Sequence, residues 1–187
     1  MKLLVGLGNP GIEYESTRHN LGCIALDEII KNYDLKIHSQ KFMSDIFIGE
    51  ISQKIIAIKP KTFMNLSGKS VLAAKSFYKI ELKDILVFHD EIDLDLGKIK
   101  VKVGGGNAGH NGLKSIDATI GVGYTRIRLG IGRPENINIE ISDYVLGKFN
   151  KTEREMVENI SKKVSDNLPD LLLEKTDSFL NKFYNRC

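Results

Sequence analysis

The sequence predicts an α/β fold: a single domain with a twisted mixed β-sheet surrounded by helices and a helical C-terminal region. Short apolar runs of strand length alternate along the chain with segments of helical periodicity, which is typical of α/β proteins. Residues 45–51 and 54–59 form an adjacent alternating pair, so part of the sheet is expected to be antiparallel. The 187 residues show no internal repeat or linker, and we therefore expect one domain over residues 1–187.

The N-terminal segment predicts a buried strand, a glycine loop and a helix. The strand covers Lys2–Gly6, and the loop runs on to Gly11. Ser16 and Thr17 are suitable caps for a helix over 18–32, because their side-chain oxygens can accept backbone N–H groups. One face of this helix would bury Ile24, Leu26, Ile29 and Ile30.

The middle of the chain predicts further strands separated by helices and one glycine-rich loop. The alternating pair is expected to turn at Ser52-Gln53 and to end at Pro60, which cannot donate to a β-ladder. The remaining segments are, in order, a helix over 66–79, a strand over 85–89, a strand over 98–103, a glycine-rich loop over 104–112, a helix of one or two turns, and a strand over 126–132.

The residues from Lys151 onward predict a helical tail. An apolar stripe with helical spacing lies at Met156, Ile160 and Val164. Pro169 is expected to interrupt this helix, because proline lacks the N–H group that the helical ladder needs. Further apolar surface beyond the proline comes from Leu171–Leu173, Phe179 and Phe183.

Composition and charge place the chain among ordinary globular proteins. The hydrophobic fraction is 42%, the charged fraction is 27% and the net charge is +3. No segment approaches the roughly 20 apolar residues of a membrane-spanning helix, and the N-terminal segment is too short for a signal-peptide core. Cys23 and Cys187 indicate neither a disulfide framework nor a zinc site, so we expect a cytoplasmic protein without membrane contact.

The first loop matches the dinucleotide-binding pattern Gly6-x-Gly8-x-x-Gly11 in form only. That pattern requires a helix that starts within the loop, whereas Pro10 delays the expected helix start to about Thr17. The loop either only turns the chain or presents Asn9, whose amide can both donate and accept, to a substrate. We therefore expect no nicotinamide or flavin cofactor.

A set of polar residues lies at the ends of the predicted elements, where α/β proteins usually bind ligands. Its members are Asn9, His19, Asn65, Asp90 and the pair His110-Asn111. A neutral histidine can take a proton from water, and an aspartate bonded to its other nitrogen fixes the tautomer. Asparagines can hold amides and a developing oxyanion without adding charge. The set favours hydrolysis without a covalent intermediate, although His19 taken alone is more typical of a surface histidine in a helix turn.

Other catalytic arrangements fit the sequence less well. No G-x-S-x-G nucleophile motif occurs, and Cys23 falls on the apolar side of its helix, which is typical of an inert buried thiol. His89 and Asp90 could supply metal ligands, but His38 and His110 are not at ligand spacing with them. We therefore expect no metal site. Gly104–Gly106 lacks the order of a phosphate-binding P-loop.

Basic residues alternate along two of the predicted strands. Lys98, Lys100 and Lys102 would share one face of their strand, and Arg126 and Arg128 would share a face of theirs. If the strands are neighbours, five cations converge. Such charges either belong to a solvated sheet face or form a phosphate clamp, which would bind RNA without base specificity.

In several motifs the chain resembles the bacterial peptidyl-tRNA hydrolases, and the resemblance covers nearly its whole length. The matching segments are Val5–Gly11 with Tyr14, Thr17–Asn20, Lys61–Gly68, His89–Asp93, Gly109–Lys114 and Arg126–Pro134. The resemblance implies a monomeric α/β hydrolase without cofactor or metal. Its implied substrate is N-blocked aminoacyl-tRNA or peptidyl-tRNA, bound through the acceptor arm and the 3′ end, and its implied role is the recycling of tRNA.

The same resemblance implies roles for individual residues. His19 would be the base that activates water, and Asp90 its partner. The residues that would position the peptide, the ester and the water are Asn9, Asn65 and Asn111. Tyr14 and Met64 would line the site, and Lys102 and Arg128 would grip the 5′ phosphate of tRNA.

The chain departs from the commoner family pattern at Asn107-Ala108, where His-Gly or a similar small pair is expected. Two alternatives stay open at the level of sequence. One is a non-catalytic RNA-binding module on the same fold, which the presence of His19, Asp90 and the asparagines disfavours. The other is a cofactor-binding oxidoreductase, which the position of the first helix disfavours.

Overall fold

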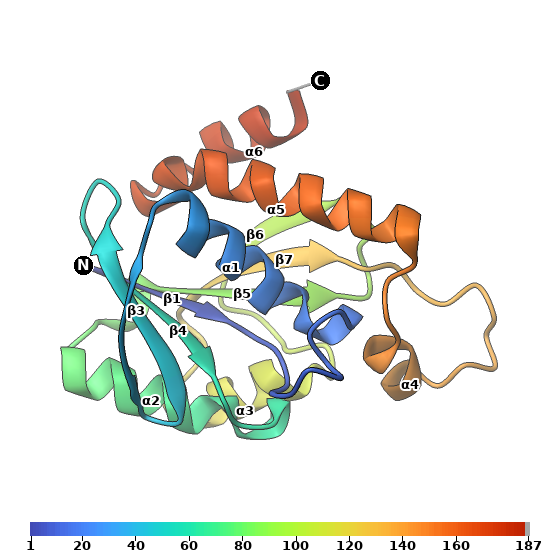
Figure 1. Cartoon of the computed structure of the whole chain (residues 1–187), viewed down its shortest axis with the longest axis horizontal. Helices are drawn as coiled ribbons and strands as arrows, with labels where there is room; N and C mark the ends of the chain where they lie inside the picture. Colours follow the sequence, from blue (N-terminus) through green and yellow to red (C-terminus); the bar gives the residue numbers. More distant parts are fainter. Residues whose placement is uncertain (186–187) are drawn as a thin grey trace.

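The computed structural model describes residues 1–185, and Figure 1 shows helices packed on both faces of a central sheet. Cys187, the second cysteine considered above, lies outside the described residues. The strands are β1 (Lys2–Gly6), β2 (Lys36–Lys41), β3 (Ser44–Glu50), β4 (Lys54–Pro60), β5 (Ile85–Glu91), β6 (Ile99–Val103) and β7 (Thr125–Gly130). The helices are α1 (Leu21–Asn32), α2 (Ser67–Tyr78), α3 (Asn111–Ile120), α4 (Ile141–Leu146), α5 (Lys151–Leu172) and α6 (Thr176–Asn185). Short 3-10 turns cover Arg18–Asn20, Met64–Leu66 and Leu82–Asp84.

The strands form one mixed sheet with the order β2-β3-β4-β1-β5-β7-β6. Strands β4, β1, β5 and β7 run parallel, whereas β2, β3 and β6 are antiparallel to their neighbours. The β3–β4 hairpin turns around Ser52-Gln53, as the alternation predicted. The predicted class, an α/β fold with a mixed sheet, is therefore confirmed.

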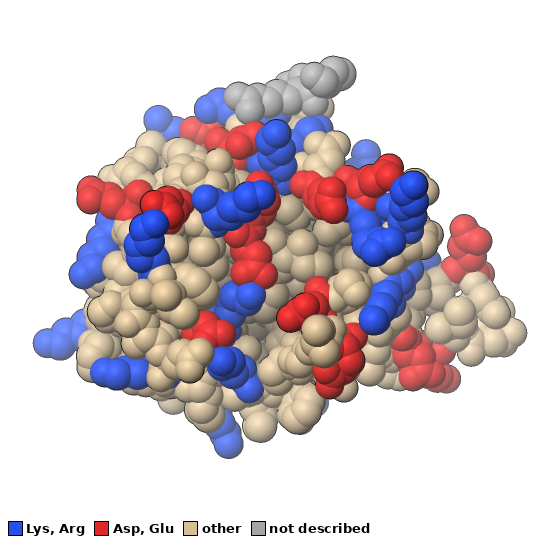
Figure 2. Space-filling view, viewed as in Figure 1, with Lys and Arg blue, Asp and Glu red and all other residues tan. Residues whose placement is uncertain are grey.

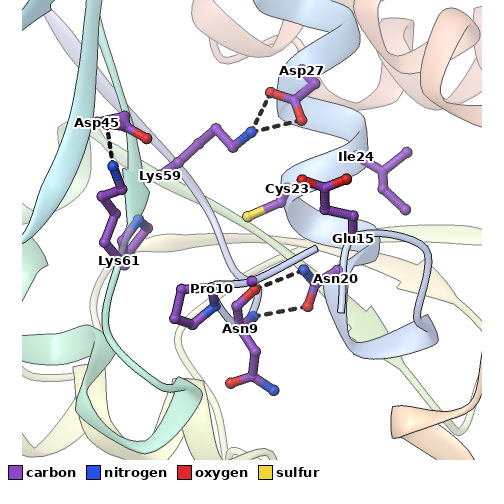
Figure 3. A pocket seen from close by; sticks show the side chains of 12 residues that line it. Asn9, Pro10, Glu15, Asn20, Cys23, Ile24, Asp27, Asp45, Lys59 and Lys61 are labelled. Atoms are coloured by element: carbon purple, nitrogen blue, oxygen red, sulfur yellow. Dashed lines mark hydrogen bonds and ion pairs between the residues drawn. The ribbon is translucent and has the colours of Figure 1, made fainter. Parts of the chain in front are cut away.

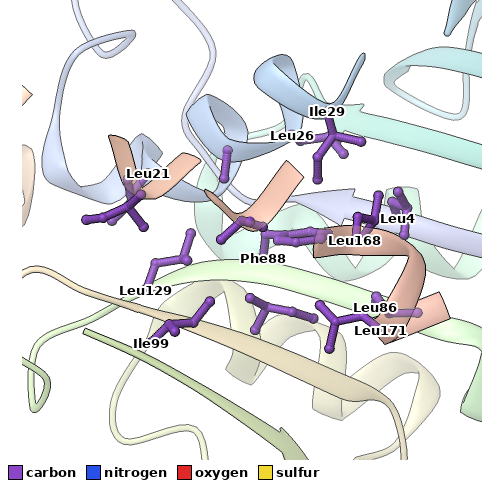
Figure 4. Packing of buried hydrophobic residues seen from close by; sticks show 14 of the residues in the cluster. Leu4, Leu21, Leu26, Ile29, Leu86, Phe88, Ile99, Leu129, Leu168 and Leu171 are labelled. Atoms are coloured by element: carbon purple, nitrogen blue, oxygen red, sulfur yellow. The ribbon is translucent and has the colours of Figure 1, made fainter. Parts of the chain in front are cut away.

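Two apolar layers hold the helices against the sheet. Helices α1, α5 and α6 cover one face, and α2 and α3 cover the other (Figure 1). Figure 4 shows the first layer, in which Leu26 and Ile29 of α1 and Leu168 of α5 pack on Phe88 of β5. Strands β1 and β5 are buried along their whole length, because helices cover both of their faces.

The carboxyl ends of the four parallel strands lie at one edge of the sheet. Helix α1 follows β1 on one face, and α2 follows β4 on the other, so the connections diverge beside β1. In open α/β sheets the crevice at such a point is the usual ligand site. The loops after β1, β4 and β5 carry Asn9, Asn65 and the residues that follow Asp90 to this edge.

Three elements differ from the sequence prediction. Strand β2 was not expected, because it is an edge strand that is exposed on both sides and shows no apolar alternation. Helix α4 was also missed, since it has only six residues and none of them is fully buried. Helix α3 is longer than the one or two turns expected, with ten residues.

Helix α5 continues through Pro169 to Leu172, so the expected interruption was wrong. Proline at this position leaves the carbonyl oxygen of Ser165 without its usual helical N–H donor. The phenol of Tyr33, at the end of α1, donates to that oxygen at 2.9 Å. A tertiary contact thus replaces the missing bond. Within residues 1–185, neither this long helix nor any other combines the length and apolar character needed to cross a membrane.

This replacement predicts a measurable cost for Tyr33→Phe. The substitution leaves the Ser165 carbonyl without a donor, and we expect it to lower the free energy of unfolding by about 1–3 kcal/mol. Urea denaturation measures the change. In a Pro169→Ala background the restored N–H can serve the same carbonyl, so the cost of Tyr33→Phe should shrink. Equal costs in both backgrounds would contradict the proposed replacement.

Candidate active site

The glycines of the first loop allow α1 to approach the sheet closely. A Cβ atom at Gly8 would lie 2.8 Å from Sγ of Cys23, and one at Gly22 would lie 2.1 Å from the carbonyl oxygen of Phe88. The helix itself begins only at Leu21, well beyond the loop. This is not the geometry of a dinucleotide site, in which the helix starts within the loop.

The same loop holds Asn9 in a fixed position. Its backbone N–H donates to Oδ1 of Asn20 at 2.8 Å, and Nδ2 of Asn20 donates to the Asn9 carbonyl at 2.9 Å (Figure 3). The Asn9 side-chain oxygen accepts the backbone N–H of Met64 at 2.8 Å. The side-chain amide is thereby oriented with its oxygen occupied and its Nδ2 donor left for a ligand.

His19 lies in the 3-10 turn Arg18–Asn20, directly before α1. The side chain of Thr17 does not cap the helix as expected, since its hydroxyl donates to the Tyr14 carbonyl at 2.7 Å. This bond closes the loop that precedes the turn. His19 is only 8% exposed, so the turn places its imidazole inside the protein rather than on the surface.

The carboxylate of Asp90, at the end of β5, contacts two histidines. Nδ1 of His19 lies 3.0 Å from both carboxylate oxygens, and Nε2 of His110 lies 2.9 Å from Oδ1. An ionised carboxylate can only accept, so both ring nitrogens donate. For His19 this places the proton on Nδ1 and leaves the lone pair of Nε2 available to accept a proton.

His110 is also the N-cap of α3. Its Nδ1 accepts the backbone N–H groups of Gly112 at 3.1 Å and Leu113 at 3.3 Å. A nitrogen that accepts two N–H groups carries no proton, so the proton of neutral His110 resides on Nε2 and points to Asp90. The sequence had placed His110 in the polar set without a role, because histidine is not among the usual N-cap residues.

The electrostatics of the pair favour its charged form. Burial disfavours the imidazolium, but the charge and hydrogen bond of Asp90 outweigh burial and raise the pKa of His19 above its ordinary value. Burial likewise works against the Asp90 carboxylate, yet His19 and His110 together lower the pKa of Asp90 well below its ordinary value. Asp90 therefore stays ionised at neutral pH, and its charge favours the protonated form of His19.

His89 adjoins this group but takes no part in it. Its Nδ1 donates to the backbone carbonyl of Asp90 at 2.7 Å, and burial and the neighbouring His110 lower its pKa to about 3. His89 thus stays neutral at the end of β5.

Only one group among the described residues, formed by His19, Asp90 and His110, has ligand atoms close enough for a metal ion, within 4.8 Å of one another. In this arrangement both histidine N–H groups already donate to the carboxylate, and the second nitrogen of His110 caps α3. The geometry is that of a hydrogen-bonded triad, and a metal would have to displace both protons.

The triad opens into a cavity of about 370 Å³. The residues that line it include His19, Asp90, Ile92, Asn111, Arg133, Ile141 and Val145. A larger cavity of about 530 Å³ is lined by Asn9 and Asn20 together with Cys23, Lys59 and Asp45 (Figure 3). Burial raises the pKa of Cys23 to about 12, so this second cavity holds no reactive thiol, and we assign the chemistry to the first.

Of the remaining predicted substrate residues, only Asn111 lines one of these two cavities. Met64 is buried, and a Cβ at Gly112 would come 2.5 Å from its sulfur, so it packs on the start of α3. Asn111 lines the cavity of the triad, whereas Asn65 is exposed in its 3-10 turn. Tyr14 is half-buried in the loop closed by Thr17. Asn9 thus bonds to Met64, and His19 contacts Asp90. Within residues 1–185, no hydrogen bond joins Asn65 or Tyr14 to the triad.

Strands β6 and β7 are neighbours, as the clamp hypothesis required. Lys100 lies opposite Arg128 and Lys102 lies opposite Arg126 in the register. These side chains lie on the α3 side of the sheet, because Ile127 between the arginines packs in the other layer. On the side of the molecule that Figure 2 shows, basic and acidic side chains are interspersed.

The cluster of free cations is nevertheless smaller than five. Arg126 is buried and donates to Asp117 at 2.8 Å, so its charge is neutralised within the fold. Lys98 lies just before β6, with its ammonium 5.7 Å from the ring centroid of Tyr184 on α6. The sequence did not reveal these partners, because periodicity does not show which side chains of neighbouring or distant elements meet.

Lys102 and Arg128 line a small cavity of about 60 Å³ together with His89 and Glu91. Nε of Arg128 donates to Glu91 at 2.9 Å, whereas Lys102 is exposed. Arg128 is therefore held in place by one carboxylate while part of its guanidinium remains accessible.

Comparisons with known proteins agree on one family. A family model described as peptidyl-tRNA hydrolase matches residues 3–187. A peptidyl-tRNA hydrolase of Rickettsia bellii (strain RML369-C) is 53% identical over 184 residues, which cover 97% of this chain and 99% of that protein. One of Rickettsia africae (strain ESF-5) is 50% identical over the same shares. The crystal structure of peptidyl-tRNA hydrolase from Acinetobacter baumannii has a TM-score of 0.91 at 35% identity, covering 99% of this chain and 95% of that one. The resemblance seen in the motifs is thus confirmed.

The His19–Asp90 pair predicts a pH-dependent contribution to stability. Because the pKa of folded His19 is raised above 6.5, its contribution is complete below pH 6.5 and is lost as the pH rises through the folded pKa. Because the pKa of folded Asp90 is lowered, its contribution to stability is complete above pH 3.8 and is lost as the pH falls through the folded pKa. We expect His19→Gln to lower the Tm most between pH 3.8 and 6.5, and less at alkaline pH.

Calorimetry over a pH series measures this difference. His38→Gln serves as the control, since His38 is exposed on the edge strand β2. A loss of Tm in His19→Gln that stays constant across the pH series would contradict the assigned charge states.

Proposed function

Because the chain belongs to the peptidyl-tRNA hydrolase family, we propose that it hydrolyses the ester between a peptide and tRNA by using His19 to activate water. The chain is a hydrolase of the peptidyl-tRNA ester bond, and we propose which of its residues carry out the reaction. The observation that carries it is the contact between Nδ1 of His19 and the buried carboxylate of Asp90, 3.0 Å apart at the wall of a cavity.

His19 acts as the general base. Its Nδ1–H donates to Asp90, so Nε2 is free to take a proton from a water molecule as that water attacks the ester carbonyl. Asp90 stabilises the imidazolium that forms, without itself becoming protonated. The proton is then available for the leaving ribose oxygen of tRNA, which completes the hydrolysis with no covalent intermediate.

Neutral amides orient the substrate around this base. Asn9 offers its Nδ2 donor to a carbonyl of the peptide, since its oxygen is occupied by the Met64 N–H. Asn111 lines the same cavity as His19 and is assigned to the attacking water or the developing oxyanion. Asn65 is exposed near Met64 and is assigned to the ester end of the substrate.

The lining of the site fits a peptide joined to an adenosine. Ile92, Ile141 and Val145 give the cavity an apolar wall for peptide side chains. We assign Met64, which is fixed against Gly112, and Tyr14, which is half-buried beside the first loop, to contacts with the peptide and the 3′-terminal adenosine.

The tRNA is held outside the reaction centre by Lys102 and Arg128. Both line one small cavity on the α3 side of the sheet, and neither is fully neutralised by the fold. Two neighbouring cations suit a terminal phosphate, which is the same in every tRNA, so the contact gives affinity without sequence selection. A substrate released from ribosomes fits a monomeric, single-domain, cytoplasmic enzyme that recycles tRNA, and we propose that assignment for this chain.

Release of the acyl-amino acid from N-acetyl-aminoacyl-tRNA tests the proposal. We expect His19→Ala to lower kcat by about 10²–10⁴-fold, the usual contribution of a general base. The control is His38→Ala, on the exposed edge strand. An active His19→Ala protein would refute the mechanism. If the unaltered chain released no acyl-amino acid, the alternative of a non-catalytic RNA-binding protein would be favoured.

The pH profile tests the role of Asp90. The base must be neutral, so kcat/KM should fall below the raised pKa of His19, which lies above 6.5. In Asp90→Asn only burial acts on His19, and we expect the acid limb to move to lower pH while kcat falls by roughly 10²–10⁴-fold. An acid limb that does not move would show that Asp90 does not set the pKa of the base.

The clamp predicts a change in salt dependence. Lys102→Ala and Arg128→Ala should each weaken tRNA binding and reduce the slope of log Kd against log salt by about one. Lys36→Ala, on the exposed edge strand β2, is the control. Filter binding over a salt series measures the slope, and an unchanged slope in both clamp variants would count against the assignment.

A further inference from the structure

The residue before His19 connects the catalytic turn to the opposite wall of the cavity. We propose that Arg18 is a positioning residue that holds helix α4 against the turn carrying His19 and thereby sets the affinity for substrate. This inference rests on the proposed function only in taking the cavity of the triad as the substrate site.

The guanidinium of Arg18 is enclosed by partners from three segments. Nη2 donates to both carboxylate oxygens of Glu153 at 2.9 and 3.0 Å, and Nη1 donates to the Lys148 carbonyl at 3.2 Å. The group also lies over the rings of Tyr144 at 4.4 Å and Phe149 at 5.4 Å. The side chains of the ion pair are only 12% and 22% exposed, so the pair is shielded from solvent and more ordered than a surface pair.

Each of these partners belongs to a structural junction. Glu153 forms the capping box of α5, in which its side chain accepts the Asn150 N–H at 2.7 Å. Tyr144 lies on α4, and its hydroxyl donates to the Ile131 carbonyl after β7 at 2.8 Å. Arg18 therefore joins the start of α5, helix α4 and the segment after β7 to the turn that carries His19.

Helix α4 is anchored at few points: Tyr144 and Val145 pack against the larger apolar layer, and the Arg18 guanidinium lies over the Tyr144 ring. It has six residues, none of them fully buried, and a helix of this length is not stable by itself. The segment before it is exposed, with Ile137 at 92%. Yet α4 supplies Ile141 and Val145 to the cavity wall. The width of the cavity thus depends on where Tyr144 is held.

Backbone bonds join the same segments and reach Gly147, the residue that follows α4, whereas the Arg18 guanidinium packs on Tyr144 within α4. The Arg18 N–H donates to the Gly147 carbonyl at 3.0 Å, and the Phe149 N–H donates to the Ser16 carbonyl at 3.2 Å. These bonds fix the turn and the residues after α4, and they survive any change of the Arg18 side chain. Loss of the guanidinium should therefore loosen the wall while leaving the His19–Asp90 contact intact.

The first test compares Arg18→Met with Lys182→Met, which breaks an ion pair to Asp170 between α5 and α6, away from the cavity. For hydrolysis of N-acetyl-aminoacyl-tRNA, we expect Arg18→Met to raise KM by about tenfold and to change kcat by less than about threefold. The acid limb of the pH profile should not move. Lys182→Met should leave KM unchanged even if both variants lower the Tm. An unchanged KM in Arg18→Met, or a shifted acid limb, would overturn the proposal.

A second variant displaces the guanidinium without removing it. A Cβ at Gly147 would lie 2.9 Å from Nη1 of Arg18, and the φ angle of −71° at Gly147 suits any residue. Gly147→Ala should raise KM in the same direction, and the double variant should be no worse than Arg18→Met alone. Additive effects, or no effect of Gly147→Ala, would reject the proposal even if Arg18→Met fails to fold. An inactive His19→Ala protein together with an unchanged KM in Gly147→Ala would reject the role of Arg18 but not the proposed function.

Discussion

The buried carboxylate of Asp90 is the group on which the rest of the site depends. It accepts N–H groups from His19 and His110, which come from segments 71 and 20 residues away in the chain. A charge in this position would be costly without partners, because it is removed from water at the end of a central strand. The two histidines supply the hydrogen bonds that make it tolerable, and the same bonds fix both rings. Stability of the site and orientation of the base therefore have one physical cause.

This arrangement links catalysis to the local structure of two helices. His110 fixes its own tautomer by capping α3 and so presents Nε2–H to Asp90. His19 is placed by a 3-10 turn whose approach to β5 requires glycine at position 22. The asparagine pair Asn9–Asn20 extends this order to the neighbouring loop. The side chains of Asn9 and His110 are thus held by backbone groups and that of His19 by Asp90, and such preorganisation lowers the cost of binding a transition state.

The family explains the activity, while the particular contacts explain how this chain performs it. In the proposed mechanism, neutral amides and an apolar wall recognise the peptide, and the cations of a neighbouring small cavity recognise tRNA. The arginine that does line the cavity of the triad, Arg133, pairs with Asp93, so its charge is offset there. Arg18 does lie beside His19 in sequence, but Glu153 neutralises it, so it can connect helices without disturbing the titration.

The sequence alone determined the fold class, the hairpin, most strand positions and the polar set at one edge, because apolar periodicity and strand order are local properties. It also indicated His19, Asp90 and Asn9, through motifs whose order is specific to one family. Only the tertiary structure decided which cations are free, since Asp117 neutralises Arg126 and Glu91 holds Arg128. It likewise decided that α5 runs through Pro169, because Tyr33 replaces the missing donor. These outcomes depend on contacts between different elements of the fold, and no local pattern encodes the distance between two side chains.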